Sequence, residues 1–122
     1  MTADDLEDHL REIGLSVSRS EDVQGLEYTV VKGFVVPTGG LQGHECDVAI
    51  QRVLTVPYVP PPAIHTRPHL VSMDGTDPVK TMASSLGDDW QYWSRRYDRE
   101  ATPRGFWAHV ITVLGDERWI PC

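Results

Sequence analysis

The residues best suited to chemistry in this sequence are two cysteines, five histidines and several hydroxyl side chains. His44 and Cys46 are separated by one residue and His65 and His69 by three, so the two pairs offer four side chains of the types that bind zinc. A structural zinc site usually takes paired ligands from tight turns, whereas Cys46 falls in an expected strand and a proline stands between the two histidines. We therefore expect no metal site and no cofactor.

Length and composition indicate one domain over residues 1–122, since 40% hydrophobic and 24% charged residues are ordinary for a globular protein. The formal net charge of -7 disfavours nucleic-acid binding, which depends on neutralising phosphates. No apolar run approaches the roughly 20 residues that cross a membrane, and the acidic N-terminal stretch lacks the features of a secretory signal. We expect a cytoplasmic protein without nucleic-acid or membrane partners.

The centre of the sequence is a proline-rich segment, Pro57-Tyr58-Val59-Pro60-Pro61-Pro62, which predicts a rigid extended turn because each proline removes a backbone donor. Before it, Leu6, Leu10 and Ile13 recur at helical spacing behind a Thr2/Asp5 capping box, which predicts an N-terminal helix. Two strands are expected over residues 27–36 and about 45–54, with a bulge or turn at Gly33, and they should pair antiparallel.

After the proline segment we expect a short strand over residues 63–66, a loop over residues 70–79, and two helices. Trp90, Trp93 and Tyr97 at helical spacing predict the first helix over residues 89–98. Thr102 as N-cap and Gly115 as stop predict the second. The fold class is thus α+β, with an N-terminal helix, an antiparallel meander of three or four strands, and C-terminal helices.

This order of elements resembles that of ubiquitin-conjugating enzymes. The proline segment and the stretch Ile64-His65-Thr66-Arg67-Pro68-His69-Leu70 are similar to that family's tyrosine-proline turn and its His-Pro-Asn approach to the active site. Val59 stands where the family usually has a further proline, and Pro68-His69 is a variant of the triplet.

The run Gly-Asp-Asp-Trp-Gln-Tyr-Trp-Ser-Arg-Arg at residues 87–96 is similar to a tryptophan-serine-arginine signature in a prokaryotic branch of the superfamily. Asp47-Val48-Ala49-Ile50 is consistent with that branch. The resemblance implies a bacterial modification system, in which the partners are a ubiquitin-like protein and an adenylating activating enzyme, beside a metal-dependent deconjugating protease.

In ubiquitin-conjugating enzymes a cysteine shortly after the His-Pro-Asn triplet holds the modifier as a thioester. Residues 71–81 of this chain contain no cysteine. Cys46 lies upstream on the expected core face, where a thiol is inert, and Cys122 lies on a terminal segment that we expect to be loose. The resemblance therefore gives neither cysteine this role.

Two functions follow from the missing cysteine. In the favoured one, the chain is a pseudoenzyme that acts as an adaptor and binds a ubiquitin-like protein or its activating enzyme. In the other, a hydroxyl transfers the modifier with the help of a neighbouring base, and no spacing singles out one pair. The hydroxyl candidates are Ser72, Thr76, Ser84, Ser85 and Ser94, and the candidate bases are His65, His69, Asp74 and Asp77.

The expected site surface lies on the loop after the third strand and on the element that carries the tryptophan-serine-arginine signature. Its members are His65, Pro68, His69, Asp74, Asp77, Trp93, Ser94 and Arg95. A function of another class, a small interaction or ligand-binding domain without any link to conjugation, stays open. A metal-dependent hydrolase is disfavoured because the sequence contains no His-Glu-x-x-His pattern.

Overall fold

The computed structural model describes residues 1–53, 61, 63–72, 81–94 and 101–122. Two helices and six strands are seen there, in the order α1 (Ala3–Glu12), β1 (Ser16–Glu21), β2 (Glu27–Val35), β3 (Glu45–Gln51), β4 (Ile64–Arg67), β5 (Thr81–Ser84), β6 (Gly87–Trp93) and α2 (Pro103–Leu114). The α+β class and the N-terminal helix are confirmed. Most of the proline segment lies outside the described residues.

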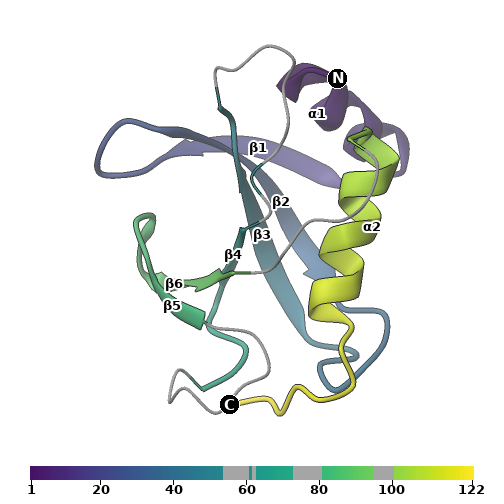
Figure 1. Ribbon diagram of the computed structural model, residues 1–122, viewed down its shortest axis with the longest axis vertical. Helices are drawn as coiled ribbons and strands as arrows, with labels where there is room; N and C mark the ends of the chain where they lie inside the picture. Colours follow the sequence, from purple (N-terminus) through teal and green to yellow (C-terminus); the bar gives the residue numbers. More distant parts are fainter. Residues whose placement is uncertain (54–60, 62, 73–80, 95–100) are drawn as a thin grey trace.

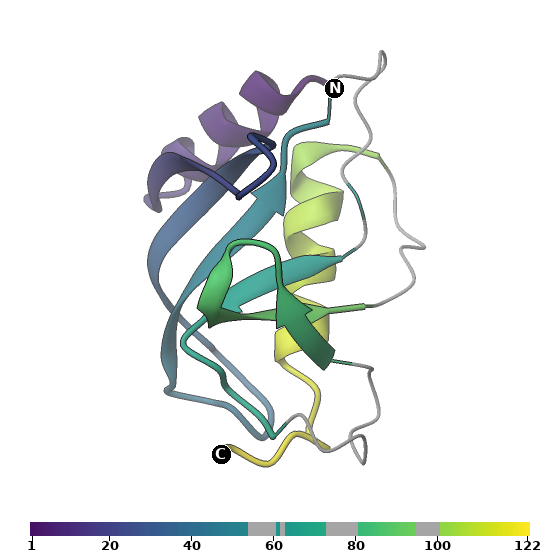
Figure 2. The same ribbon diagram turned by 90° about the vertical axis from the view of Figure 1, so that its left-hand side faces the viewer.

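The strands form one antiparallel sheet in the order β1-β2-β3-β4-β6-β5. The sheet is strongly curved, and α2 runs across one of its faces (Figures 1 and 2). The β1–β2 and β5–β6 hairpins project on the side of the molecule away from α2 (Figure 1). This curvature brings the turns of the two hairpins together, as the hydrogen bond from Ser85 to Asp22 shows.

Both helices begin at the caps that the sequence predicted, and α2 also ends at the predicted residue, whereas α1 ends at Glu12. Thr2 and Asp5 form a reciprocal capping box at the start of α1, with distances of 2.8 and 3.0 Å. Thr102 caps α2 by accepting a hydrogen bond from the Gly105 amide at 3.0 Å, and Gly115 ends the helix.

The main core lies between the two helices and the sheet face that they cover. Its largest fully buried side chains include Leu6 and Leu10 from α1, Phe106 from α2, and Trp93 from β6. A second, smaller cluster on the opposite face of the sheet contains Tyr28, Val30, Ala49 and Trp90. The sheet is therefore covered on both faces in the region where β6 lies.

The predicted helix over residues 89–98 is wrong, because residues 87–93 form strand β6. In a strand, successive side chains point to opposite faces. Trp93 accordingly joins the main core, whereas Trp90 joins the small cluster. A three-residue interval that fits one helical face thus separates the two tryptophans onto two covered faces of a sheet.

The sheet also contains two strands that were not expected. Residues 16–21 form β1, although their sequence is mostly polar, and residues 81–84 form β5. The predicted strands over residues 27–36, 45–54 and 63–66 correspond to β2, β3 and β4. Gly33, with a φ of 65°, lies in the register shift of the β2–β3 pair, which confirms the expected irregularity.

Replacing Thr102 with alanine should lower the free energy of unfolding by about 1 kcal/mol, because the first turn of α2 loses the side chain that accepts the Gly105 N–H. Urea denaturation measures the change. Thr102→Ser keeps the hydroxyl acceptor and should stay close to the wild-type value, so an equal loss in both variants would show that the cap is not the cause.

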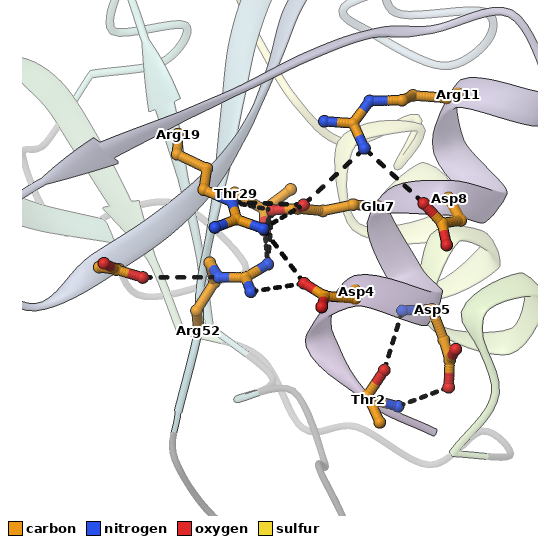
Figure 3. A network of polar contacts seen from close by, with 10 residues as sticks. Thr2, Asp4, Asp5, Glu7, Asp8, Arg11, Arg19, Thr29 and Arg52 are labelled. Carbon is orange, nitrogen blue, oxygen red and sulfur yellow. Dashed lines mark hydrogen bonds and ion pairs between the residues drawn. The ribbon is translucent and has the colours of Figure 1, made fainter.

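An ion-pair network joins α1 to three strands or strand ends, with the buried carboxylate of Glu7 at its centre (Figure 3). Arg19 of β1 donates to both Glu7 oxygens, with distances between 3.0 and 3.3 Å. Arg52, directly after β3, donates to Glu7 and to Asp4, and the Thr29 hydroxyl of β2 donates to Glu7 at 2.9 Å. The network fixes the position of α1 on the sheet.

Neither of the two described helices is long and apolar enough to cross a membrane.

Candidate functional site

A histidine and a serine are hydrogen-bonded on the sheet face away from the helices. His65 lies on β4, and its neighbour in the sheet is Tyr92 of β6. Ser84 ends β5, the next strand along. The Ser84 hydroxyl lies 2.7 Å from Nδ1 of His65. The sheet order β4-β6-β5 therefore joins two of the predicted candidates, a base and a hydroxyl, that are 19 residues apart in sequence.

The His65 imidazole is held on two sides by aromatic rings. Tyr28 and Tyr92 each lie edge-on to it, with ring centroids 5.2 Å away. Burial lowers the pKa of His65 to about 4, and the charge of Asp22 opposes this shift only in part. The imidazole is therefore neutral near pH 7, with one nitrogen that accepts a hydrogen bond.

Asp22, in the turn between β1 and β2, holds the two hairpin tips together. One carboxylate oxygen accepts the amides of Gln24 and Leu26, and the other accepts the hydroxyls of Tyr28 at 3.2 Å and Ser85 at 3.1 Å. Burial works against ionisation of Asp22, but these hydrogen bonds outweigh it and lower the pKa. We call Asp22, Tyr28, His65, Ser84 and Ser85 the hairpin cluster.

The loop after β4 carries the two other described members of the predicted motif. Pro68 is exposed and follows a cis peptide bond. His69 is half-buried, and its Nε2 donates to the backbone carbonyl of Asp88 at 3.0 Å. His69 is thus held next to the start of β6.

The buried side chain of Gln91 holds the next two residues of this loop. Its Oε1 accepts the amides of Leu70 at 2.9 Å and Val71 at 3.4 Å, and its Nε2 donates to the Val71 carbonyl at 2.9 Å. No local signal predicts this role, since Gln91 stands between two aromatic residues in the segment for which the sequence predicts a helix.

Cys122 is held against the same loop, contrary to the expectation of a loose terminal segment. Its amide donates to the Leu70 carbonyl at 3.0 Å, Pro121 forms a β-bridge with Val71, and the exposed Cys122 thiol donates to the His69 carbonyl at 3.4 Å. The only other cysteine, Cys46, is buried in the main core. Burial raises the pKa of the Cys46 thiol to about 12, so it is not ionised near pH 7.

The remaining predicted site residues do not all lie at a surface. Trp93 is fully buried in the main core, where its Nε1 donates to the Thr66 hydroxyl at 2.8 Å and its ring meets Trp119 edge-on. Ser94 is exposed. Asp74, Asp77 and Arg95 lie outside the described residues. Trp93 thus lies beneath the predicted surface, and His65 lies in the hairpin cluster rather than beside His69.

No group of three or more histidine, cysteine, aspartate or glutamate side chains with metal-binding geometry is present in the part of the chain that the structure describes. Cys46 points into the apolar core. His65 is bonded to Ser84 through one nitrogen, and His69 is bonded to the Asp88 carbonyl. The side chains that could have formed a zinc site therefore have separate environments.

The protein consists of an N-terminal helix, an antiparallel sheet and a C-terminal helix, and a Pro-His turn follows the central strand β4. These features define a small α+β protein with a ubiquitin-conjugating-like fold. The family model described as prokaryotic E2 family E, where E2 denotes ubiquitin-conjugating enzymes, matches residues 2–115. The chain therefore belongs to prokaryotic E2 family E. Searches of curated proteins and of solved structures find no match.

Membership of this family connects the chain to ubiquitin-like conjugation in bacteria. It confirms that the chain is related to ubiquitin-conjugating enzymes of prokaryotes, as the proline segment and the Pro68-His69 turn predicted. The tryptophan-serine-arginine signature, the identity of the partners and the loss of the usual cysteine stay predictions.

Proposed function

We propose that this protein acts in a bacterial ubiquitin-like modification system by binding the ubiquitin-like protein or its activating enzyme, without holding the modifier as a cysteine thioester in the usual position. The main observation in support is that residues 71–81, which follow the Pro-His turn, contain no cysteine. Cys46 is buried, and its raised pKa leaves it without the thiolate that thioester formation needs.

The binding surface that we propose centres on Pro68 and Ser94, which are exposed, and on the half-buried His69. Gln91 holds the backbone of Leu70 and Val71, which follow His69 in the loop. Trp93, which precedes Ser94, is packed in the main core. The proposed surface also includes Arg95, which follows Ser94, and Asp74 and Asp77, which come later in the sequence than His69. A rigid support under an exposed patch reduces the entropy lost on binding.

The test uses the proteins encoded next to this gene. A neighbouring ubiquitin-like protein and a neighbouring adenylating enzyme would be purified and mixed with this protein and ATP. We expect binding to at least one of them by calorimetry, and no adduct that dithiothreitol removes in intact-mass spectrometry. Absence of such neighbouring genes, or of binding to both proteins, would contradict the proposal.

A second candidate function, thioester transfer through Cys122, is favoured by the position of that thiol against the His69 carbonyl. In the same mixture it requires a dithiothreitol-sensitive adduct that persists in Cys46→Ala and disappears in Cys122→Ala. This outcome would replace the binding-only proposal with a transferase whose thiol comes from a distant part of the sequence.

A further inference from the structure

The hairpin cluster contains a hydroxyl and an imidazole with the geometry of a nucleophile and its base. We propose that Ser84 is an acyl-acceptor nucleophile with His65 as its general base, and that it accepts the C-terminal acyl group of a ubiquitin-like protein as an ester. The identity of this acyl donor rests on the proposed function above. The reactivity of Ser84 rests only on the geometry of the pair.

The hydrogen bonds around Ser84 direct its proton toward His65. The Leu86 amide donates to the Ser84 oxygen at 3.1 Å, so the oxygen already accepts one hydrogen bond. Since that bond does not use the hydroxyl proton, we assign the 2.7 Å contact as Ser84 donating and Nδ1 of His65 accepting. We assign the neutral tautomer with its proton on Nε2 from this network.

The surroundings of His65 favour a base that is unprotonated at neutral pH. The polar and titratable groups that face the ring are Tyr28 of β2, Tyr92 of β6, Ser84 of β5 and, through its charge, Asp22 in the β1–β2 turn. Asp22 itself is hydrogen-bonded to Tyr28 and Ser85. Burial is the larger influence and keeps the pKa of His65 near 4.

Ser84 is positioned where another molecule can reach it. It is half-buried at the end of β5, which is the outer strand of the described sheet, and the next residue, Ser85, is exposed. Met82 on the same strand is 43% exposed, so apolar surface also adjoins the pair. His65 is buried behind Ser84, which excludes water from the base while the nucleophile stays near the surface.

The proposed step is a balanced acyl transfer. The Ser84 oxygen attacks the carbonyl carbon of a thioester that the modifier forms with a cysteine of its activating enzyme. A carbon–oxygen bond forms and the carbon–sulfur bond breaks. The hydroxyl proton passes to Nδ1 of His65 and then to the departing thiolate, which leaves as a thiol and restores the neutral imidazole.

The test uses a small acyl donor, so that it needs no partner protein. The full chain is incubated with a short peptide thioester ending in glycine, treated with dithiothreitol to remove cysteine adducts, and mapped by mass spectrometry. We expect an ester on Ser84, with labelling reduced at least about tenfold in Ser84→Ala. His65→Gln should slow labelling by roughly a hundredfold, the usual size of a general-base contribution.

Matched variants separate reactivity from folding. Ser18→Ala removes an exposed hydroxyl of β1, outside the hairpin cluster, and leaves the Ser84–His65 contact, so it should label at the wild-type rate. Ser84→Cys should recover acylation, detected without dithiothreitol as a thioester at residue 84. Melting curves of each variant check the fold. Labelling of Ser84 that is unchanged in His65→Gln, or no labelling of Ser84 in the folded wild type, would overturn the proposal.

The pH profile distinguishes a base-assisted serine from a merely exposed one. Because His65 stays neutral above its low pKa of about 4, the labelling rate at Ser84 should change little between about pH 6 and pH 9. An unassisted hydroxyl would instead react about tenfold faster per pH unit, as its alkoxide fraction rises. That steeper dependence would contradict the role of His65.

The closing experiment repeats the mapping with the neighbouring ubiquitin-like protein, its activating enzyme and ATP. A dithiothreitol-resistant adduct on Ser84 is the expected result. If the peptide thioester labels Ser84 but the modifier does not, the assigned acyl donor is wrong. The proposal that Ser84 and His65 form a reactive pair would still hold. If the modifier binds but neither donor acylates Ser84, the proposal that Ser84 and His65 form a reactive pair is wrong. The proposed binding function would still hold.

Discussion

Replacing Glu7 with alanine should lower the free energy of unfolding by about 3 kcal/mol, because one member of a largely buried ion-pair network is lost. The Glu7 side chain is 2% exposed and Arg52 13% exposed, so water replaces little of the lost interaction. Arg52 would keep Asp4 and the longer contact to Glu27, which limits the loss. Urea denaturation followed by circular dichroism measures it.

The matched control for this variant is Asp8→Ala on the same helix. Asp8 is 70% exposed and contacts Arg11 at 3.8 Å, so its removal should change stability by less than about 0.5 kcal/mol. Equal losses in the two variants would show that helix charge in general, and not the buried network, stabilises the fold.

Lowering the pH should reduce the amount by which Glu7 stabilises the fold. Burial raises its pKa, but the hydrogen bonds from Arg19 and Thr29 and the charge of Arg52 outweigh burial and lower the pKa below the ordinary value. The stabilisation is therefore complete above the unfolded pKa of about 4.3 and is lost as pH falls through the lower folded value. The stability difference between wild type and Glu7→Gln should shrink between about pH 6 and pH 3; a constant difference would contradict this assignment.

The elements that could be predicted from the sequence are those whose signals are local. The Thr2/Asp5 capping box and the Thr102 cap each act within one helical turn, and both are seen in the structure. Strand β3 alternates Cys46 and Val48 on the main core with Asp47 outside it, as predicted. These signals need no knowledge of which segments lie side by side.

The wrong predictions concern segments whose secondary structure depends on tertiary contacts. Strand β6 is covered on both faces, so its tryptophans show no alternation of apolar and polar residues, and the helical period fits them by coincidence. Strand β1 lies at the outer edge of the sheet and is mostly exposed, and apart from Val17 its residues are polar. Neither strand has the pattern of a half-buried strand.

The candidate site was predicted only in part for the same reason. His65 and Ser84 were both candidates, but their contact depends on β6 lying between β4 and β5 in the sheet. Cys122 reaches His69 across 53 residues of sequence, through the bridge between Val71 and Pro121. Spacing along one chain contains no signal for either contact.

Replacing Gln91 with alanine should lower the free energy of unfolding by about 3 kcal/mol, because buried amides of Leu70 and Val71 and the Val71 carbonyl lose their partner. The loop that these residues belong to also holds Cys122, through the Leu70 carbonyl. We therefore expect the Cys122 thiol of the folded variant to react faster with Ellman's reagent than that of the wild type.

Two further variants decide whether Gln91 positions this loop. Gln91→Glu keeps an oxygen that accepts the Leu70 amide but loses the donor to the Val71 carbonyl, so its stability should fall between wild type and Gln91→Ala. Gln42→Ala, at an exposed glutamine, should change neither stability nor thiol reactivity. A destabilised Gln91→Ala with unchanged Cys122 reactivity would contradict this role. It would mean that the contacts of Pro121 with Val71 and of Cys122 with Leu70 hold the thiol without help from Gln91.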